Sequence, residues 1–323
     1  MLSRVADSIY WMSRYIERAE NVARFMDVNL RLMLDLPMGA EEQWEPMVNT
    51  TGDQKLFAGK HPVATRENVI RFLAFDASYP NSILSCLRSA RENARSVREI
   101  ISSEMWEQLN KFYLMVNDAA HSQETLDEPA EFFAAVRNAS QAFGGAMNAT
   151  MSHGEGWHFC RLGLQLERAD KTSRILDVKY FILLPTPADV GTPIDDIQWA
   201  AVLRSASAFE MYRKRHGRIL PEKVVDFLLL DREFPRAIHH CLIKSEESLH
   251  LISGTPLGTF RNPAEQRLGQ LRSDVAFAQV GDIIASGLHE FLDGFQTRLN
   301  LVGGAIFETF FAIRPLAEGA RFK

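Results

Sequence analysis

The chain has few cysteines, no long apolar run and no excess of positive charge. Its 323 residues include only three cysteines, which form no CxxC pair and no even set. This scarcity excludes a disulfide framework, and small buried thiols in a reducing compartment are the ordinary interpretation. No stretch approaches the roughly 18 to 20 apolar residues that a membrane-spanning helix requires.

The chain has fewer basic than acidic residues. The formal net charge is −5 and the pI is about 6.0, which argues against general affinity for nucleic acids or anionic membranes. The opening residues, MLSRVADSIYWMSR, lack the apolar segment of a secretory signal and carry Asp7 early. We therefore expect a cytoplasmic protein that has neither a nucleic-acid nor a membrane partner.

Motifs of catalysis and cofactor binding are missing as well. The sequence has no GxSxG elbow and no dinucleotide fingerprint, and its histidines (HGEGWH at 153–158, HH at 239–240) do not match HExxH. The glycine pairs 144–145 and 303–304 lack the strand and Lys of a phosphate loop, and we interpret them as points of close helix approach. We expect no metal and no cofactor, and the balance favours a non-catalytic protein without deciding the question.

What the chain does have is internal repetition. Residues 16–28, IERAENVARFMDV, match residues 166–178, LERADKTSRILDV, at six of thirteen positions. Residues 72–87 match 227–242 at an offset of 155, and FGGAM at 143–147 resembles VGGAI at 302–306. Three pairs in the same order predict a tandem duplication. The expected repeats are residues 1–151 and 152–323, packed as one two-lobed body.

Both repeats have a helical pattern. Apolar residues in the first helix recur at alternating steps of four and three, which is the spacing of a packed helical face. Further helices are expected at 85–102, 130–150, 194–216, 237–253 and 266–311. The prediction is an all-α, bundle-like fold built from two tandem pseudo-symmetric repeats, each opening with a helix that carries a Glu-Arg pair. The positions of the first apolar face are Val5, Ile9, Met12, Ile16, Ala19, Ala23, Met26, Leu30 and Met33.

The Glu-Arg pairs are the candidate site. Adjacent helical residues point about 100° apart, so neither pair can close on itself. Glu17 falls on the polar side of its helix, whereas Glu167 falls on a far more apolar stripe, so we expect the second helix to be the interior one. A buried charge requires partners. The candidate members of a binding or structural charge network are Arg14, Glu17, Arg18, Arg24, Asp76, Glu167, Arg168, Arg174 and Asp231.

Three interpretations of these charges stay open. They form a structural network that docks the two repeats, or they line a polar chamber for a small charged ligand or a peptide terminus, or they are solvated surface pairs. Separately, one dense basic cluster is either a solvated helix end or a docking patch for an acidic partner or phosphate. Its members are Arg213, Lys214, Arg215 and Arg218.

Two segments resemble a known family. Residues 3–28, SRVADSIYWMSRYIERAENVARFMDV, and residues 211–242, MYRKRHGRILPEKVVDFLLLDREFPRAIHHCL, are similar to the bacterial alpha-E family, named for a predicted α-helical domain with an ER motif. The resemblance implies ER motifs at Glu17-Arg18 and Glu167-Arg168. Leu164 stands where the first copy has Arg14, and Asn81 stands where the second has Arg236, so a strictly two-fold site is not expected.

The resemblance also implies partners. Members of that family are typically encoded beside, or fused to, a circularly permuted ATP-grasp protein, together with a transglutaminase-like protease and sometimes a proteasome-like peptidase. ATP-grasp enzymes join carboxylates to amines, so the expected function is a non-catalytic or substrate-presenting subunit of a peptide or amide ligase system. The alternative is a small enzyme or ligand-binding protein that uses Glu17 or Glu167 and the arginines around them in peptide or amide-bond chemistry.

Overall fold

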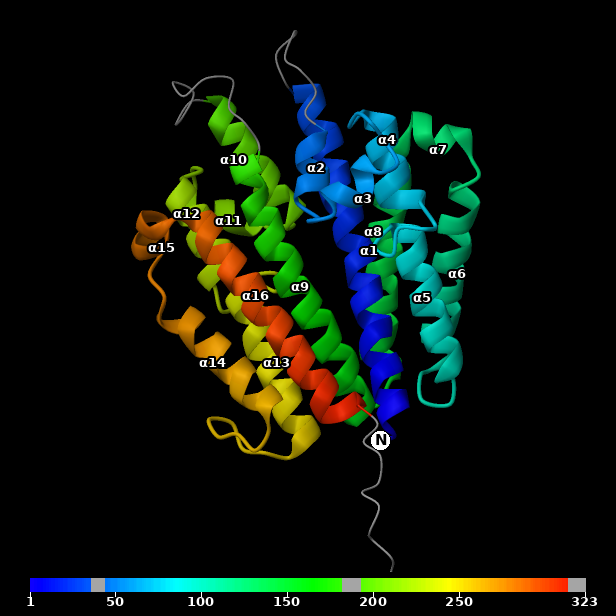
Figure 1. Ribbon diagram of the computed structural model, residues 1–323, viewed down its shortest axis with the longest axis vertical. Helices are drawn as coiled ribbons and strands as arrows, with labels where there is room; N and C mark the ends of the chain where they lie inside the picture. Colours follow the sequence, from blue (N-terminus) through cyan, green and yellow to red (C-terminus); the bar gives the residue numbers. More distant parts are fainter. Residues whose placement is uncertain (36–43, 182–192, 313–323) are drawn as a thin grey trace, which may run out of the picture.

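The computed structural model describes residues 1–35, 44–181 and 193–312 of the chain (Figure 1). Helices make up the regular structure of these ranges, and no strand occurs in them. The predicted all-α fold is confirmed. The buried hydrophobic side chains form one large contiguous cluster that draws on both halves of the sequence.

Two long helices occupy the centre. Helix α1 (Ser3–Asp35) and helix α9 (Glu155–Phe181) lie side by side along the long axis of the molecule (Figure 1). The N-terminal ammonium of Met1 contacts the carboxylate of Glu155 at 2.8 Å, and Arg14 contacts Glu167 farther along. The two helices therefore run parallel.

Gly163 sets the closest approach of the two central helices. A Cβ atom at this position would lie 2.4 Å from the carbonyl oxygen of Tyr10, well inside van der Waals contact. Only a residue without a side chain lets the two backbones come this close. Ile9, Met12 and Ala19 of the predicted apolar face of α1 are buried, with no exposed surface.

Three longer helices flank each central helix (Figure 1). Helices α5 (Ile83–Ser96) and α8 (Pro129–Thr150) pack on α1, and α6 (Ser103–Ala119) packs on both of them. On the other side, α13 (Ile238–Ser253) and α16 (Leu288–Ile306) pack on α9, and α14 (Pro263–Phe277) packs on both of those. Side-chain oxygens of Ser82, Ser102 and Asn262 cap the first turns of α5, α6 and α14.

Short helices fill the ends of the bundle. Those from the first half of the chain are α2 (Glu45–Asn49), α3 (Gln54–Ala58), α4 (Arg66–Ile70), the π-helical turn η1 (Arg71–Phe75) and α7 (Gln123–Asp127). Those from the second half are α10 (Pro193–Ser205), α11 (Phe209–His216), α12 (Pro221–Leu230), α15 (Val280–Ser286) and the π-helical turn η3 (Phe307–Phe311).

Two expected long helices are broken. The segment 194–216 is divided between α10 and α11 at Ser207, whose φ of 51° is left-handed and ends the first helix. The segment 266–311 is divided into α14, α15, α16 and η3, with a break at Gly287, whose φ is 103°. Periodicity alone carries no signal for these local backbone reversals.

The interpretation of the glycine pairs as close helix contacts is wrong. A Cβ atom on Gly144, Gly145 or Gly304 would meet no atom within 4 Å, and at Gly303 the nearest is the tip of Arg14 at 3.8 Å. These glycines face open space rather than a neighbouring backbone. At Gly144 and Gly145 that space belongs to the chamber described below.

Candidate functional site

The two Glu-Arg pairs bind each other reciprocally across the α1–α9 interface. Arg168 donates to both carboxylate oxygens of Glu17, from Nε at 3.0 Å and from Nη2 at 2.8 Å. Arg18 donates to both oxygens of Glu167, from Nε at 2.6 Å and from Nη2 at 3.0 Å. Each is a bidentate arginine–carboxylate contact, the geometry that gives such pairs strength and direction. We call them the two reciprocal ion pairs.

Both glutamates are interior. Glu17 is 1% exposed and Glu167 is 0% exposed, so the expectation that only the second helix is buried is wrong. The polar stripe of α1 is covered by α9, by α8 and by the segment that precedes α13. A polar stripe faces water only when no other element covers it, and here the covering elements bring charges of their own.

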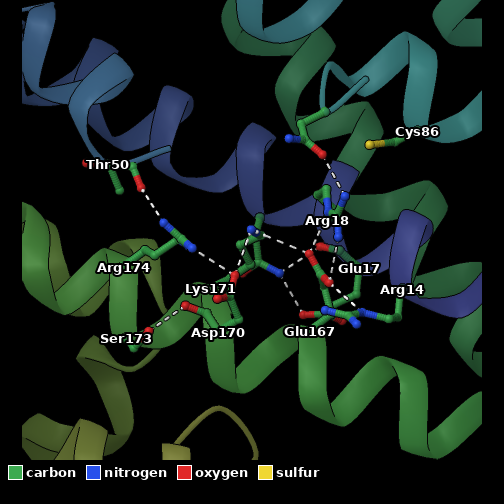
Figure 2. A network of polar contacts seen from close by, with 12 residues as sticks. Arg14, Glu17, Arg18, Thr50, Cys86, Glu167, Asp170, Lys171, Ser173 and Arg174 are labelled. Atoms are coloured by element: carbon green, nitrogen blue, oxygen red, sulfur yellow. Dashed lines mark hydrogen bonds and ion pairs between the residues drawn. The ribbon is translucent and has the colours of Figure 1, made fainter. Parts of the chain in front are cut away.

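Each glutamate has additional cationic or polar partners, and these differ between the pairs. Glu167 also accepts from Arg14 Nε at 2.8 Å and lies 3.5 Å from Lys171 Nζ (Figure 2). Glu17 accepts instead from Arg236 Nη1 at 2.7 Å and from Asn21 Nδ2 at 2.8 Å. Glu17 and Glu167 therefore each have two arginines.

The two glutamates receive their second arginine from different elements. Leu164 stands on α9 where the matched segment of α1 has Arg14, and Arg236 supplies the second positive charge to Glu17 from the segment before α13. On the opposite side, Asn81 occupies the position equivalent to Arg236 and accepts from Arg18 Nη1 at 2.6 Å.

Two further carboxylates extend the network along the helices. Glu20 accepts from Arg24 at 2.8 Å, from Arg236 at 2.6 Å and from the hydroxyl of Ser140 at 2.6 Å. Asp170, its counterpart on α9, pairs with Lys171 at 2.8 Å and Arg174 at 3.1 Å (Figure 2). Arg174 also reaches the carbonyl of Thr50 at 3.5 Å.

The electrostatics of the network keep its carboxylates ionised. Burial alone raises the pKa of Glu17, but the charges of Arg168 and Arg236 and their hydrogen bonds outweigh it and lower the pKa to about 2. Burial likewise opposes ionisation of Glu167, yet Arg18, Lys171 and Arg14 hold its pKa well below the ordinary value. Desolvation dominates at Arg236, where the positive charges of Arg168 and Arg24 add to it and lower the pKa of the guanidinium.

The structure brings together most of the predicted network and leaves two members outside. Asp76 pairs with Lys60 and accepts from Ser78, and Asp231 pairs with Arg215 and accepts backbone N–H groups of Glu233 and Phe234. Both aspartates end a helix and cap the turn after it, so local hydrogen bonds satisfy them far from Glu17. The predicted residues that do lie in the network are Arg14, Glu17, Arg18, Arg24, Glu167, Arg168 and Arg174.

The basic cluster at the end of α11 is exposed. Arg213, Lys214, Arg215 and Arg218 all face solvent, and Arg215 is committed to Asp231. A surface groove of about 370 Å³ lies beside Lys214 and Arg215 and has Phe227 and Phe234 in its lining. Its role as a docking patch stays a prediction.

A chamber of about 470 Å³ lies on one side of the network. Helix α1 is one wall, and α8 and α9 are the others. Its rim includes the exposed residues Gln141, Gly145 and Asn148 of α8, so it opens to solvent. The polar and charged residues that line it deeper inside are Glu17, Glu20, Arg24, Ser140, Arg161, Gln165, Arg168 and Arg236.

Gln165 and Trp157, which line this chamber, each have a buried polar atom without a hydrogen-bond partner in the described part of the chain. The two atoms are Oε1 of Gln165, whose residue is 8% exposed, and Nε1 of Trp157. Buried polar atoms are paired in most native structures, so atoms left over beside a cavity mark a place where a ligand group fits.

Several members of the site were not predicted from the sequence. Glu20 and Asp170 occupy equivalent positions in the matched segments, and that alignment was the available signal for both. Gln165, Trp157 and Ser140 carry no motif, and only the packing of α8 beside α9 identifies them. In residues 1–35, 44–181 and 193–312, no group of three or more His, Cys, Asp or Glu side chains is arranged to hold a metal ion.

Comparison with known proteins places this architecture in a family. Residues 1–311 match the Alpha-E model, described as a predicted alpha-helical domain with a conserved ER motif. The chain belongs to the Alpha-E family. The Glu17-Arg18 and Glu167-Arg168 dipeptides are the ER sequences in this chain, and they form the two reciprocal ion pairs.

Curated relatives are longer proteins. An uncharacterised protein of Mycobacterium bovis and two of Mycobacterium tuberculosis are each 22% identical to this chain over 337 aligned residues. The alignment covers 93% of this chain but only 37% of each relative, so the chain spans just over a third of their length. No solved structure matches the chain. None of the helices in the described ranges combines the length and apolar composition needed to cross a bilayer.

Proposed function

We propose that this Alpha-E protein is a non-catalytic binding subunit of an amide-ligase system, which holds a small charged ligand for an ATP-grasp-type partner. The observation that carries the proposal is the arginine-lined chamber between α8 and α9. A rigid wall of paired charges with a cavity of about 470 Å³ beside it is suited to orienting a ligand, and this volume lies within the ordinary range of small-molecule sites.

The charges favour binding over acid–base catalysis. A general base works best when its pKa lies near the operating pH. The pKa of Glu17 is lowered to about 2, and that of Glu167 lies well below its ordinary value, so neither carboxylate holds a proton at neutral pH. Both are also occupied by two arginines. The enzyme alternative, with either glutamate as acid or base, has no such support.

The partner remains part of the proposal. The family resemblance implies an ATP-grasp ligase and a transglutaminase-like protease, and the greater length of the mycobacterial relatives fits a unit that works beside further domains. The exposed cluster of Arg213, Lys214, Arg215 and Arg218 is the proposed contact with an acidic face of the ligase. The setting is proposed to be the bacterial cytoplasm, where Cys86, Cys160 and Cys241, all free and buried, stay reduced.

We further propose that the two halves are tandem repeats. Support comes from equivalent positions at an offset of 155. Helix α5 begins at Ile83 and α13 at Ile238, and the ion pair Lys60–Asp76 has its counterpart in Arg215–Asp231. The sulfur of Cys86 contacts the carbonyl of Pro80 as that of Cys241 contacts Pro235. The contacts between aromatic rings follow the same offset. Phe72 contacts Phe57 and Tyr79, and at the equivalent positions Phe227 contacts Tyr212 and Phe234.

The test is reconstitution with a purified circularly permuted ATP-grasp protein from the same organism. Size-exclusion chromatography with light scattering at micromolar concentration is expected to give a complex. The double change Arg213→Glu and Lys214→Glu is expected to weaken it at least tenfold, because both side chains are exposed and reversal opposes an acidic face. Lys111→Glu on α6, also an exposed cation, is the matched control. Absence of a complex with the unaltered protein would reject the ligase partnership.

A further inference from the structure

We propose that the chamber binds the C-terminal end of a peptide, with the free carboxylate at Arg24 and Arg236 and the neighbouring amide at Gln165. The inference rests on the proposed function, because it names the ligand of the same chamber. Four observations support it: the charge balance of the walls, the unused N–H donors of the arginines, the unpartnered polar atoms of Gln165 and Trp157, and the open space beside Gly144 and Gly145 on α8.

The walls of the chamber carry one surplus positive charge. Arg24, Arg168 and Arg236 face it together with Glu17 and Glu20, which is three cations against two anions. The remaining cation on the wall, Arg161, pairs with Glu247 at 3.0 Å, a carboxylate that Lys244 also contacts at 2.8 Å. A single negative charge neutralises this set, which favours a carboxylate over a dianionic phosphate.

The arginines have donors to spare. A guanidinium has five N–H groups, and Arg24, Arg168 and Arg236 each make three hydrogen bonds, which leaves two apiece. Burial lowers the pKa of Arg236, the charges of Arg168 and Arg24 add to this effect, and an anion bound beside Arg236 opposes it. A carboxylate accepting from these planar groups is the contact for which arginine is best shaped.

A carboxylate alone leaves the side chains of Gln165 and Trp157 without hydrogen-bond partners. Gln165 Oε1 is an acceptor without a donor, and Trp157 Nε1 is a donor without an acceptor. A peptide chain supplies both, since one of its N–H groups suits Gln165 and one of its C=O groups suits Trp157. Both residues line the same cavity as the arginines. They therefore select a peptide rather than a simple organic anion.

The spacing on α9 suits an extended tail. Trp157, Gln165 and Arg168 lie along one helix, and at 1.5 Å rise per residue Trp157 and Arg168 are about 16 Å apart along its axis. An extended chain spans at most about 3.3–3.6 Å per residue, so about five residues reach from one end to the other.

The α8 side of the chamber is kept open by Gly144 and Gly145. Neither would place a Cβ within 4 Å of another atom, so the missing side chains are not needed for packing. The side chain of a larger residue at Gly144 would enter the space that the tail occupies. On the opposite side of the two reciprocal ion pairs, around Arg18 and Arg174, Thr50, Asp53 and Tyr79 leave only about 30 Å³. The ligand site is therefore one-sided.

The test compares N-acetyl-pentaalanine with a free C-terminus and the same peptide as its C-terminal amide, by isothermal titration calorimetry and by NMR chemical-shift changes at the Trp157 indole. We expect saturable binding of the free acid and a loss of about tenfold or more for the amide, since hydrogen bonds to a charged group are removed. Equal affinity for the two forms, or tighter binding of inorganic phosphate, would overturn the inference.

Variants separate the site from the fold. Gly144→Leu is expected to reduce the affinity for the free acid at least tenfold by filling the chamber, whereas Gly294→Leu, at an exposed position of α16 with open space around it, is the control that leaves binding unchanged. Gln165→Leu is expected to weaken the peptide but not acetate. Undiminished binding in a folded Gly144→Leu protein contradicts the location.

The two proposals fail separately. If the peptide binds as expected but no complex forms with the ATP-grasp protein, the chamber assignment stands and the ligase partnership falls. If the complex forms while neither peptide form binds at millimolar concentration, the partnership stands and the ligand assignment is rejected.

Discussion

Arg168 holds both carboxylate oxygens of Glu17 across the interface of α1 and α9, at 3.0 and 2.8 Å, and Arg18 holds both of those of Glu167 in return. The glutamate of each ER dipeptide therefore contacts the arginine of the ER dipeptide on the other helix. Neither motif is complete alone. The charges dock the two halves in one register, and the same charges form the wall of the chamber.

Because the two reciprocal ion pairs are equally buried, Glu17→Gln and Glu167→Gln are expected to destabilise the protein to similar degrees. Removing one partner of a buried pair leaves the other charge uncompensated, which costs about 3–5 kcal/mol. Urea denaturation followed by circular dichroism measures this. The exposed pair of Glu67 and Arg71 is the control, where Glu67→Gln is expected to cost less than about 1 kcal/mol. A much larger effect at only one glutamate contradicts the equivalence.

Acid is expected to weaken the fold over a defined range. The pKa of Glu17 falls from 4.5 to about 2 on folding, so its ionised form contributes stability that is complete above about pH 4.5 and is lost as the pH falls toward 2. The shift corresponds to about 3 kcal/mol. Glu167 and Asp170, whose pKa values are also lowered, act in the same direction.

The pH dependence has its own control. Unfolding free energies measured between pH 6 and pH 2.5 are expected to decline less steeply in Glu17→Gln, because the group whose protonation is unfavourable has been removed. Parallel curves for this variant and the unaltered protein would show that other carboxylates are responsible.

A methyl group at Gly163 is expected to separate the central helices. Its Cβ would lie 2.4 Å from the backbone oxygen of Tyr10, which cannot move away as a side-chain tip can. Gly163→Ala should therefore cost about 1–3 kcal/mol. Gly145→Ala, whose Cβ meets nothing, should stabilise α8 by up to about 1 kcal/mol through helix propensity. Thermal unfolding of the two variants side by side tests the opposite signs.

The three cysteines are expected to be inert in the folded protein. Burial raises the pKa of the thiols of Cys86, Cys160 and Cys241 to about 12, so almost no thiolate exists at pH 8. Reaction with Ellman's reagent should release no colour from native protein and three equivalents after unfolding in urea. Rapid reaction of one thiol under native conditions would contradict its position in the core.

The sequence carried enough information for the fold class and for the helices with a regular apolar face. Ile9, Met12 and Ala19 are spaced as one side of a helix, and all three are fully buried. The kinks at Ser207 and Gly287 were not predictable, because a left-handed φ leaves the hydrophobic period of the flanking helices intact.

The sequence predicts only part of the candidate site. The repeated Glu-Arg pair identified its centre, but a single-helix projection placed Glu17 toward water because the groups that cover it lie 151 and 219 residues away. Asp76 and Asp231 were assigned to the network on charge alone, whereas short-range turn hydrogen bonds satisfy them. The chamber depends on how far apart α8 and α9 stand, which no local pattern records.

The long separation between Glu17 and its partners bears on how the chain matures during synthesis. Helix α1 leaves the ribosome before α9 and the segment that precedes α13, with Glu17, Glu20 and Arg24 on a stripe that ends up buried. Arg168 follows 151 residues after Glu17, and Arg236 follows after 219. The first half of the chain must therefore keep that stripe hydrated until Arg236 has been synthesised. Final closure of the core is a late event that waits for the segment before α13.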